Sequence, residues 1–225
     1  MNIILFGPPG AGKGTQAKFI AQRYNLNHLS TGDILRDEIA NDTSLGHEVK
    51  DIMAKGLFPS DDLIMDVLRN YLVSHHNESG FIFDGVPRTM NQVHKLDSIL
   101  TQLNISIDHI IYFDVSEDQL IKRLMGRVVC SDCGTTYNEY FSKPKVEGIC
   151  DKCHGTSLIK RSDDNEASIK TRLKVYLDKT QEVIDYYQKL NLLEKIDGSL
   201  FPEQVQAELI SILDNNISIG LNSRV

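Results

Sequence analysis

The 225-residue sequence is 41% hydrophobic and 24% charged, which suits one α/β domain carrying insertions better than two independent domains. Its formal net charge of −7 argues against a nucleic-acid-binding surface over the whole protein, although a local group of arginines could still bind a polyanion. The sequence opens without a leader-like segment, and no apolar run approaches the roughly 18 residues of a membrane span, so we expect a cytoplasmic protein.

The N-terminal segment has the pattern of a strand, a glycine loop and a helix. Apolar residues 3–6 precede residues 7–15 (GPPGAGKGT), and a helical pattern follows. The loop's four glycines allow backbone N–H groups to face a phosphate, to which the helix dipole and Lys13 add positive charge. In the general phosphate-loop pattern a hydroxyl residue follows the lysine directly, whereas here Gly14 intervenes before Thr15. The stretch predicts a site for nucleotide phosphates.

Two later segments place an arginine near a predicted helix start. Residues 30–36 (STGDILR) would let a phosphate or nucleoside meet backbone N–H groups and Arg36, although an ordinary capped helix is an equal alternative. Residues 81–84 indicate a buried strand ending in Asp84, which either faces phosphates and their magnesium or caps a turn. Arg88 lies at the same edge, and Gln92 lies in the first turn of the following helix.

The remaining pattern alternates strands with helices. Further strands are predicted near residues 27–29, 107–115 and 192–197. Two helices separated near residues 41–44 form a small insertion, and a long helix carries apolar residues from Ile169 to Tyr187. A last helix begins at Pro202, and we expect the polar tail from Asn215 to fray.

The four cysteines form two Cys-x-x-Cys pairs separated by sixteen residues. In a cytosolic protein this spacing indicates a closed, tetrahedral zinc site rather than disulfides. The predicted ligands are Cys130, Cys133, Cys150 and Cys153. Four thiolates leave no position for a substrate, so the metal is expected to fold the segment and not to catalyse, and His154 is expected to be a bystander.

Arginines bracket the cysteine segment, with Arg123 and Arg127 before it and Arg161 and Arg172 after it. Singly, each is more often a solvated surface charge. Beside a phosphate loop they form the cationic set that a charge-spreading phosphoryl transition state needs. Residues Asp163 and Asp164 could cap the long helix or orient these arginines.

These motifs, in this order, extend over nearly the whole chain. With them the chain resembles the adenylate kinase family of nucleoside monophosphate kinases, in its long form with a zinc-containing lid. The resemblance implies an α/β fold of the phosphate-loop NTPase type, with a five-stranded parallel sheet flanked by helices. It implies a core of residues 1–29, 60–126 and 165–225, a helical monophosphate-binding insertion at 30–59 and a mobile lid at 127–164. Two local departures are Val86, where the family more often has Phe, and Leu57-Phe58-Pro59-Ser60, where it more often has Leu-Val-Pro-Asp.

The resemblance also implies reversible, Mg²⁺-dependent transfer of the ATP terminal phosphoryl group to AMP, giving two ADP. The implied ATP contacts are Gly10, Ala11, Gly12, Lys13, Gly14, Thr15, Arg127, Thr136, Tyr137 and Leu200. The implied AMP contacts are Thr31, Arg36, Leu57, Phe58, Pro59, Gly85, Val86, Pro87, Arg88, Gln92, Arg161 and Arg172. The implied catalytic set is Lys13, Asp84, Arg88, Arg123, Arg161 and Arg172, with Arg123, Arg161 and Arg172 converging on the exchanged phosphates. No general base is assigned, because the AMP phosphate is already anionic.

Two alternatives remain open at this point. One is a kinase for another nucleoside monophosphate on the same core. The other is a zinc ribbon that binds nucleic acid through lysines of the cysteine segment, against which stand the acids interleaved with them. We favour the adenylate kinase reading and expect a monomer with no nucleic-acid or membrane partner.

Overall fold

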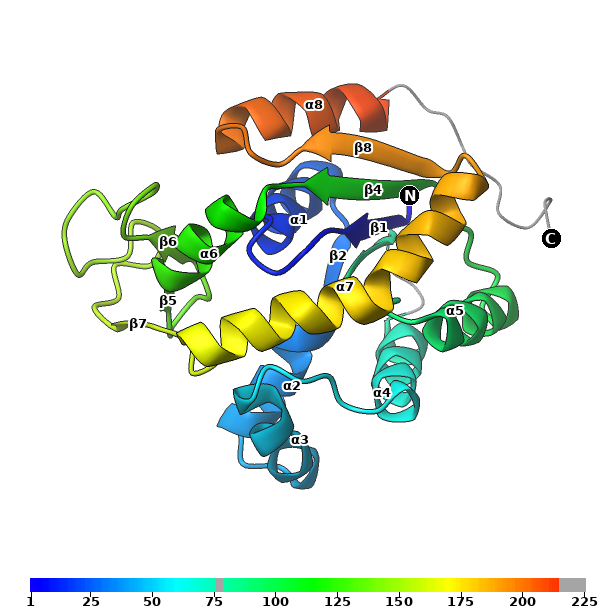
Figure 1. The fold of residues 1–225 in the computed structure, drawn as a ribbon, viewed down its shortest axis with the longest axis horizontal. Helices are drawn as coiled ribbons and strands as arrows, with labels where there is room; N and C mark the ends of the chain where they lie inside the picture. The colour runs from blue at the N-terminus through cyan, green and yellow to red at the C-terminus, as the bar shows by residue number, and fades with distance from the viewer. Residues whose placement is uncertain (76–78, 215–225) are drawn as a thin grey trace.

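The structure, a computed structural model, describes residues 1–75 and 79–214, so the tail from Asn215 lies outside the described residues. At its centre is a five-stranded parallel sheet in the order β2-β3-β1-β4-β8 (Figure 1). The strands are β1 (Ile3–Phe6), β2 (Asn27–Ser30), β3 (Phe81–Asp84), β4 (His109–Asp114) and β8 (Leu193–Asp197). The predicted sheet is confirmed, and parallel pairing brings the carboxyl ends of all five strands to one edge.

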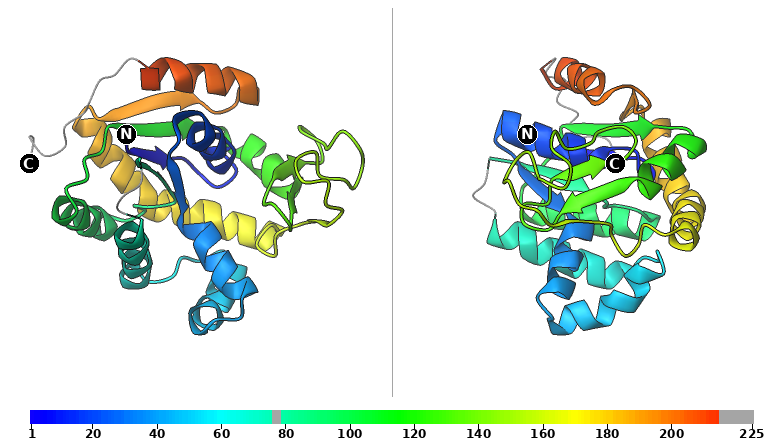
Figure 2. Two further views of the ribbon diagram at one scale, coloured as in Figure 1. Left: turned by 180° about the vertical axis from the view of Figure 1, so that it is seen from behind. Right: turned by 90° about the vertical axis from the view of Figure 1, so that its left-hand side faces the viewer.

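Helices cover both faces of this sheet, which explains why the central strands are almost continuously apolar. Alternate residues of β1 enter two different cores, Ile4 and Phe6 one of them and Ile3 and Leu5 the other. The long helix α7 crosses the face seen in Figure 1, and α1 covers the face seen from behind in Figure 2. The core helices are α1 (Lys13–Tyr24), α4 (Asp61–Ser74), α5 (Met90–Gln102), α6 (Glu117–Met125), α7 (Glu166–Lys189) and α8 (Pro202–Asp214).

The predicted helical insertion consists of α2 (Thr31–Ala40) and α3 (Ser44–Ala54). The Thr43 side chain caps α3 by accepting a hydrogen bond from the Gly46 N–H. Gly46 allows the two helices to touch, because a Cβ there would lie 2.2 Å from the Glu38 carbonyl oxygen. The pair projects below the core, and the Ser168 hydroxyl of α7 holds it by donating to the Ala54 carbonyl (Figure 1).

The cysteine segment forms a second, antiparallel sheet in the order β6-β5-β7, at the left of Figure 1. Its strands are β5 (Arg127–Cys130), β6 (Thr136–Asn138) and β7 (Leu158–Ile159). The sequence did not predict these strands, because they are two to four residues long and carry no sustained alternation of apolar and polar residues.

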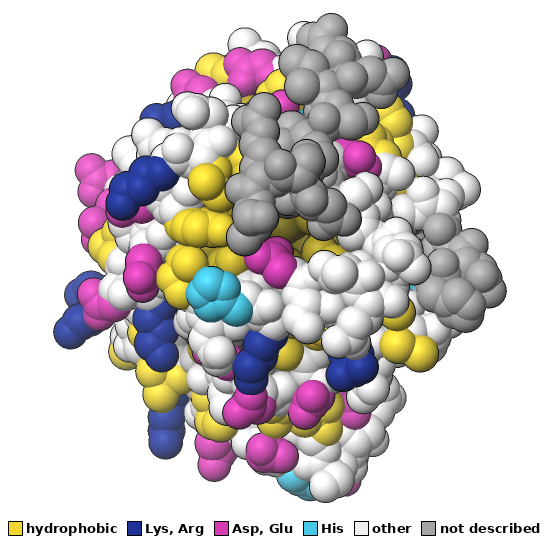
Figure 3. Space-filling model, turned by 90° about the vertical axis from the view of Figure 1, so that its right-hand side faces the viewer, with side chains coloured by type: hydrophobic (Ala, Val, Ile, Leu, Met, Phe, Trp, Pro, Cys, Tyr) yellow, Lys and Arg dark blue, Asp and Glu magenta, His cyan; other side chains and the backbone are white. Residues whose placement is uncertain are grey.

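The described helices include none with both the length and the apolar character needed to cross a bilayer. On the face drawn in Figure 3, the Lys and Arg side chains of the described residues lie among Asp and Glu side chains and form no single basic patch.

Candidate active site and metal centre

The glycine loop between β1 and α1 wraps around the ammonium group of Lys13. Its Nζ donates to the Gly7 carbonyl at 2.6 Å and to the Pro8 carbonyl at 3.0 Å. Gly10 has φ +86°, and a Cβ there would lie 2.9 Å from the Leu124 side chain, so both conformation and space require glycine. Burial lowers the pKa of Lys13 to about 8, and the charge of Asp84 partly opposes this. The loop and its cation are therefore preformed.

Asp84 ends β3 beside this loop, as the sequence predicted. Its Oδ2 lies 3.2 Å from His28 Nε2, and a Cβ placed on Gly14 would lie 3.5 Å from the same oxygen. Burial alone would raise the pKa of Asp84, but the hydrogen bond from His28 and the charge of Lys13 lower it below its ordinary value. A buried carboxylate is thus held ionised beside the phosphate loop. Sequence reasoning missed His28, because only the pairing of β2 with β3 brings it there.

A cleft opens between the helical insertion and the end of β3. Its walls carry nine of the residues expected to contact AMP, namely Thr31, Arg36, Leu57, Phe58, Pro59, Gly85, Arg88, Gln92 and Arg172. Val86 and Pro87, also expected there, are buried, and Val86 belongs to the apolar core. Arg161 is tied to the insertion by its ion pair with Asp33.

Two polar residues of the cleft are already held by the protein. The Arg88 guanidinium carbon lies 4.2 Å from the centroid of the Phe58 ring, while its Nε donates to the Gly85 carbonyl. The Gln92 amide oxygen accepts from the Arg88 N–H at 2.7 Å, and its nitrogen donates to Asp61 at 2.7 Å. The role of Asp61 and the stacking on Phe58 were missed, since neither follows from local sequence spacing.

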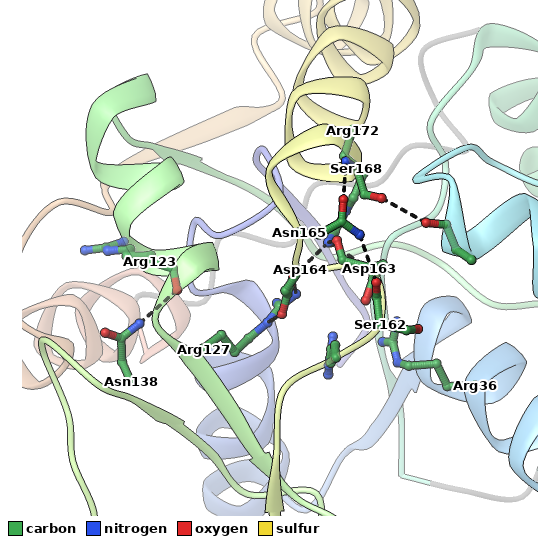
Figure 4. Close-up of polar contacts among 12 residues, drawn as sticks. Arg36, Arg123, Arg127, Asn138, Ser162, Asp163, Asp164, Asn165, Ser168 and Arg172 are labelled. Atoms are coloured by element: carbon green, nitrogen blue, oxygen red, sulfur yellow. Dashed lines mark hydrogen bonds and ion pairs between the residues drawn. The ribbon is translucent and has the colours of Figure 1, made fainter.

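Three carboxylates, Asp33, Asp163 and Asp164, bind arginines of the insertion and of the cysteine segment's flanks. Figure 4 shows Asp163 and Asp164 with Arg127 and Arg172. Arg127 makes two hydrogen bonds to Asp164, at 2.6 and 2.5 Å, and Arg172 lies 2.9 Å from Asp163 and 3.1 Å from Asp164. Asp33 pairs with Arg36 at 2.5 Å and with Arg161 at 3.3 Å. The suggested orienting role of Asp163 and Asp164 matches these contacts.

The pairing keeps both kinds of group charged. Burial would raise the pKa of Asp33, but the charges of Arg36 and Arg161 hold it well below its usual range. Burial and the neighbouring arginines lower the pKa of Arg161 to about 10, which leaves it cationic at neutral pH. The guanidinium groups therefore remain available to an anion that can compete with the carboxylates.

Arg123 does not join this network. Its guanidinium donates to the carbonyls of Gly198 and Ser199, at 2.8 and 3.4 Å, immediately before Leu200. Figure 4 shows it pointing away from Arg172 and Asp163. The expected convergence of Arg123 with Arg161 and Arg172 is thus absent from the described structure, because α6 directs Arg123 toward the loop after β8.

The sulfur atoms of Cys130, Cys133, Cys150 and Cys153 lie within 4.8 Å of one another and form no disulfide. The Cys130–Cys153 and Cys133–Cys150 sulfur pairs are each 3.5 Å apart. Tetrahedral zinc with Zn–S bonds of about 2.3 Å needs sulfurs about 3.8 Å apart, so the set fits that ion. Across the described residues, no other cluster of His, Cys, Asp or Glu side chains meets the same spacing.

Tyr137, expected over ATP, directs its side chain into this metal centre. Only 6% of the residue is exposed, and its hydroxyl lies 3.4 Å from Cys150 Sγ. If Tyr137 contacts a nucleotide, it must therefore do so through its backbone atoms. Thr136, the neighbouring residue of β6, is half-buried and on the opposite face of the strand.

The comparisons with known proteins agree on one family. The model of the family described as adenylate kinase matches residues 5–192. The chain is 46% identical to the adenylate kinase of Methanocella arvoryzae, over 93% of this chain and 96% of the relative. It is also 46% identical to the adenylate kinase of Kosmotoga olearia, over 96% of this chain and the whole relative. Identity to the adenylate kinase of Thermosipho africanus is 42%, over 95% of this chain and 99% of the relative.

Proposed function

The chain belongs to the adenylate kinase family, and from this membership we propose how its residues divide the reaction between them. It is a phosphotransferase that moves the terminal phosphoryl group of ATP to AMP, reversibly, to give two ADP. One arrangement carries the assignment. Asp84 lies beside the phosphate loop, and the next residue, Gly85, lines the cleft together with Arg36, Arg88 and Arg172. A phosphate bound by the loop and a second anion in the cleft would therefore be neighbours.

On the ATP side, residues 10–15 hold the phosphates through backbone N–H groups and the Lys13 ammonium. Arg127, with Thr136 and the backbone of Tyr137, covers them from the 127–164 segment. The base lies toward the backbone near Leu200. The hydrogen bonds of Arg123 to Gly198 and Ser199 support a role on this side, next to that backbone.

On the AMP side, the cleft beside the insertion takes the nucleotide. Arg36 and Arg88 meet its phosphate, while Thr31, residues 57–59 and Gln92 enclose the nucleoside. Gly85 forms the floor, and the buried Val86 and Pro87 support it from below. The position of Gln92, fixed between Asp61 and the Arg88 N–H, supports a rigid wall for the base. Preformed contacts of this kind favour one base over another.

During transfer, negative charge spreads over the phosphoryl group as it passes between the two nucleotides. Arg88, Arg161 and Arg172 exchange their carboxylate or carbonyl partners for this negative charge. The ammonium group of Lys13 stabilises the same charge from the phosphate loop. Mg²⁺ bound with ATP supplies further positive charge, and Asp84 would hold it, because Mg²⁺ prefers one or two carboxylates together with phosphate oxygens. The four cysteines would hold structural Zn²⁺, which fills its tetrahedron and leaves no position for chemistry.

The segments at 30–59 and 127–164 are proposed to close over the two substrates, which keeps water from the reacting phosphate. Polar contacts tie the 127–164 segment to the insertion and to the core, including Asp33–Arg161 and Lys18 Nζ to the Gly134 carbonyl. Such contacts can exchange without disrupting an apolar core. The monomeric state and the cytoplasmic location stay predictions of the sequence.

A coupled assay with saturating MgATP and a panel of AMP, GMP, CMP and UMP tests this assignment. We expect kcat/KM to be highest for AMP, and the preference to weaken in Gln92→Ala. Gln102→Ala is the matched control, because Gln102 ends α5 on the exposed surface. Equal turnover of all four monophosphates would contradict the base-binding role of the cleft, and a preference for another base would establish the alternative kinase.

A further inference from the structure

Two hydroxyl groups around β6 face two different cysteine sulfurs. Thr135 Oγ1 lies 3.1 Å from Cys133 Sγ, and Tyr137 OH lies 3.4 Å from Cys150 Sγ. Thr135 immediately precedes β6, and residues two apart in extended chain point to the same side. Thr135 and Tyr137 therefore both reach the metal centre.

The hydrogen-bond direction at Tyr137 is set by its second partner. Its hydroxyl oxygen accepts from the Asp151 N–H at 2.7 Å, which leaves the hydroxyl proton for the sulfur. A zinc-bound cysteine is a thiolate and can only accept. Because Cys150 is fully buried and Tyr137 nearly so, water could not take over this hydrogen bond if the hydroxyl were removed.

The other face of β6 is anchored to the core. The Asn138 side-chain nitrogen donates to the Arg123 carbonyl at 2.8 Å, near the end of α6. Its side-chain oxygen accepts from the Tyr140 N–H at 2.9 Å. Strand β6 therefore joins the cysteine sulfurs on one side to the helix that carries Arg123 on the other.

We propose that Thr135 and Tyr137 are positioning residues of the metal centre. Their hydroxyls hydrogen-bond the zinc-bound thiolates of Cys133 and Cys150, and so bound zinc fixes β6 and its Asn138–Arg123 contact. The inference rests on the proposed occupancy of the four cysteines by zinc. Groups that hydrogen-bond metal ligands are typically worth about 10–100-fold in metal affinity.

Tyr137→Phe and Thr135→Val test this, since each removes a hydroxyl and keeps the shape of the side chain. Tyr140→Phe and Thr156→Val are matched controls, because both residues lie on the exposed surface of the same segment. The first measurement is competition for zinc against a chromophoric chelator. We expect affinity to fall at least about tenfold in each test variant and to stay unchanged in the controls.

A second measurement replaces zinc with Co²⁺ and records the thiolate-to-cobalt charge-transfer absorption. Loss of a hydrogen bond to a thiolate should shift that band in Tyr137→Phe and Thr135→Val, and Thr135→Ser should restore it. A purely packing role for Tyr137 would leave the band in place.

The third measurement is amide exchange at Asn138 in the zinc-loaded protein, with folding checked by circular dichroism. Faster exchange in Tyr137→Phe than in Tyr140→Phe is expected. Wild-type affinity, absorption and exchange in both test variants would overturn the inference while leaving the zinc site intact. A wild-type protein that takes up no zinc would overturn the zinc assignment and the inference together.

Discussion

His28 Nε2 lies 3.2 Å from Asp84 Oδ2, where β2 and β3 run side by side toward the edge of the sheet that carries the phosphate loop. Both side chains are largely buried, with 13% and 12% of their surface exposed. The hydrogen bond from His28 is the largest of the influences that lower the Asp84 pKa against its burial. The carboxylate assigned to Mg²⁺ is thus oriented by a residue from a neighbouring strand.

His28→Leu is therefore expected to leave Asp84 without its hydrogen-bond partner. A buried polar group that loses its partner costs about 1–3 kcal/mol of stability, so the free energy of unfolding should fall by that amount. The Mg²⁺ concentration needed for half-maximal activity should rise as well. Urea unfolding and magnesium titrations check both effects. His28→Gln, which keeps a donor, should recover most of each loss, and a His28→Leu protein with wild-type stability would show that the contact is dispensable.

Lys13→Met should give a folded protein with very little kinase activity. The substitution removes the cation of the phosphate loop, while the glycine backbone and the burial of the side chain remain. Turnover in the coupled assay, with circular dichroism as the test of folding, measures the effect. Lys174→Met on the exposed side of α7 is the control. Comparable turnover in Lys13→Met and wild type would show that the phosphate loop has no role in the reaction.

Arg88→Ala, Arg161→Ala and Arg172→Ala should each lower kcat, by about a thousandfold where the side chain meets transition-state charge. Arg123→Ala is expected to differ, raising the KM for ATP more than it lowers kcat, because Arg123 lies apart from the network. Steady-state kinetics separate the two patterns. The exposed Arg69, which bonds Gln102, provides the control variant Arg69→Ala. If Arg123→Ala lowered kcat as much as the other three substitutions, Arg123 would have to act on the transferred phosphoryl group as they do.

The pKa of about 8 at Lys13 predicts opposite trends for activity and stability in alkali. Above pH 8 the free enzyme loses the ammonium charge, so kcat/KM for ATP should fall. An unfolded lysine keeps its proton to about pH 10.4, so between these values the unfolded state binds more protons and stability should rise with pH from this group. We would measure the unfolding free energy of wild type and of Lys13→Met from pH 7 to about 10. The difference between the two gives the contribution of Lys13 to the pH dependence of stability. A difference independent of pH would contradict the shift.

Removal of zinc should act on stability first. Structural zinc can supply on the order of 10 kcal/mol to a small site at neutral pH, so chelation or Cys130→Ala should loosen residues 127–164 and lower the melting temperature. At low temperature, where the core remains folded, some magnesium-dependent activity should survive. Complete loss of turnover in zinc-free protein with an ordered 127–164 segment would instead make the metal catalytic.

The features that sequence predicted best are those whose chemistry is local. The glycine loop, the strand ending at Asp84 and the cysteine spacing each lie within a short stretch, so residue type and spacing were sufficient. The contacts it missed join distant segments, such as His28 with Asp84 and Asp61 with Gln92. These depend on strand order and helix packing, which a single stretch does not encode.

Arg123 and Tyr137 show a different limit. Both were placed by resemblance on the nucleotide, and both lie on the expected elements, but the direction of each side chain follows from the element that carries it. Helix α6 turns Arg123 toward Gly198, and the alternation of β6 turns Tyr137 toward Cys150. Sequence position predicted which element carries each residue, whereas the direction of each side chain required the fold.

One oxygen of Asp33 receives both Arg36 from the insertion and Arg161 from the segment 128 residues away. We expect this carboxylate to compete with a substrate phosphate for the guanidinium N–H groups that it accepts from. Its strongly lowered pKa keeps it ionised, so the competition persists throughout the neutral range. The free energy of nucleotide binding is then the difference between two pairings instead of the full attraction of the arginines. A product held by that smaller difference can leave quickly, which favours turnover wherever product release limits the rate.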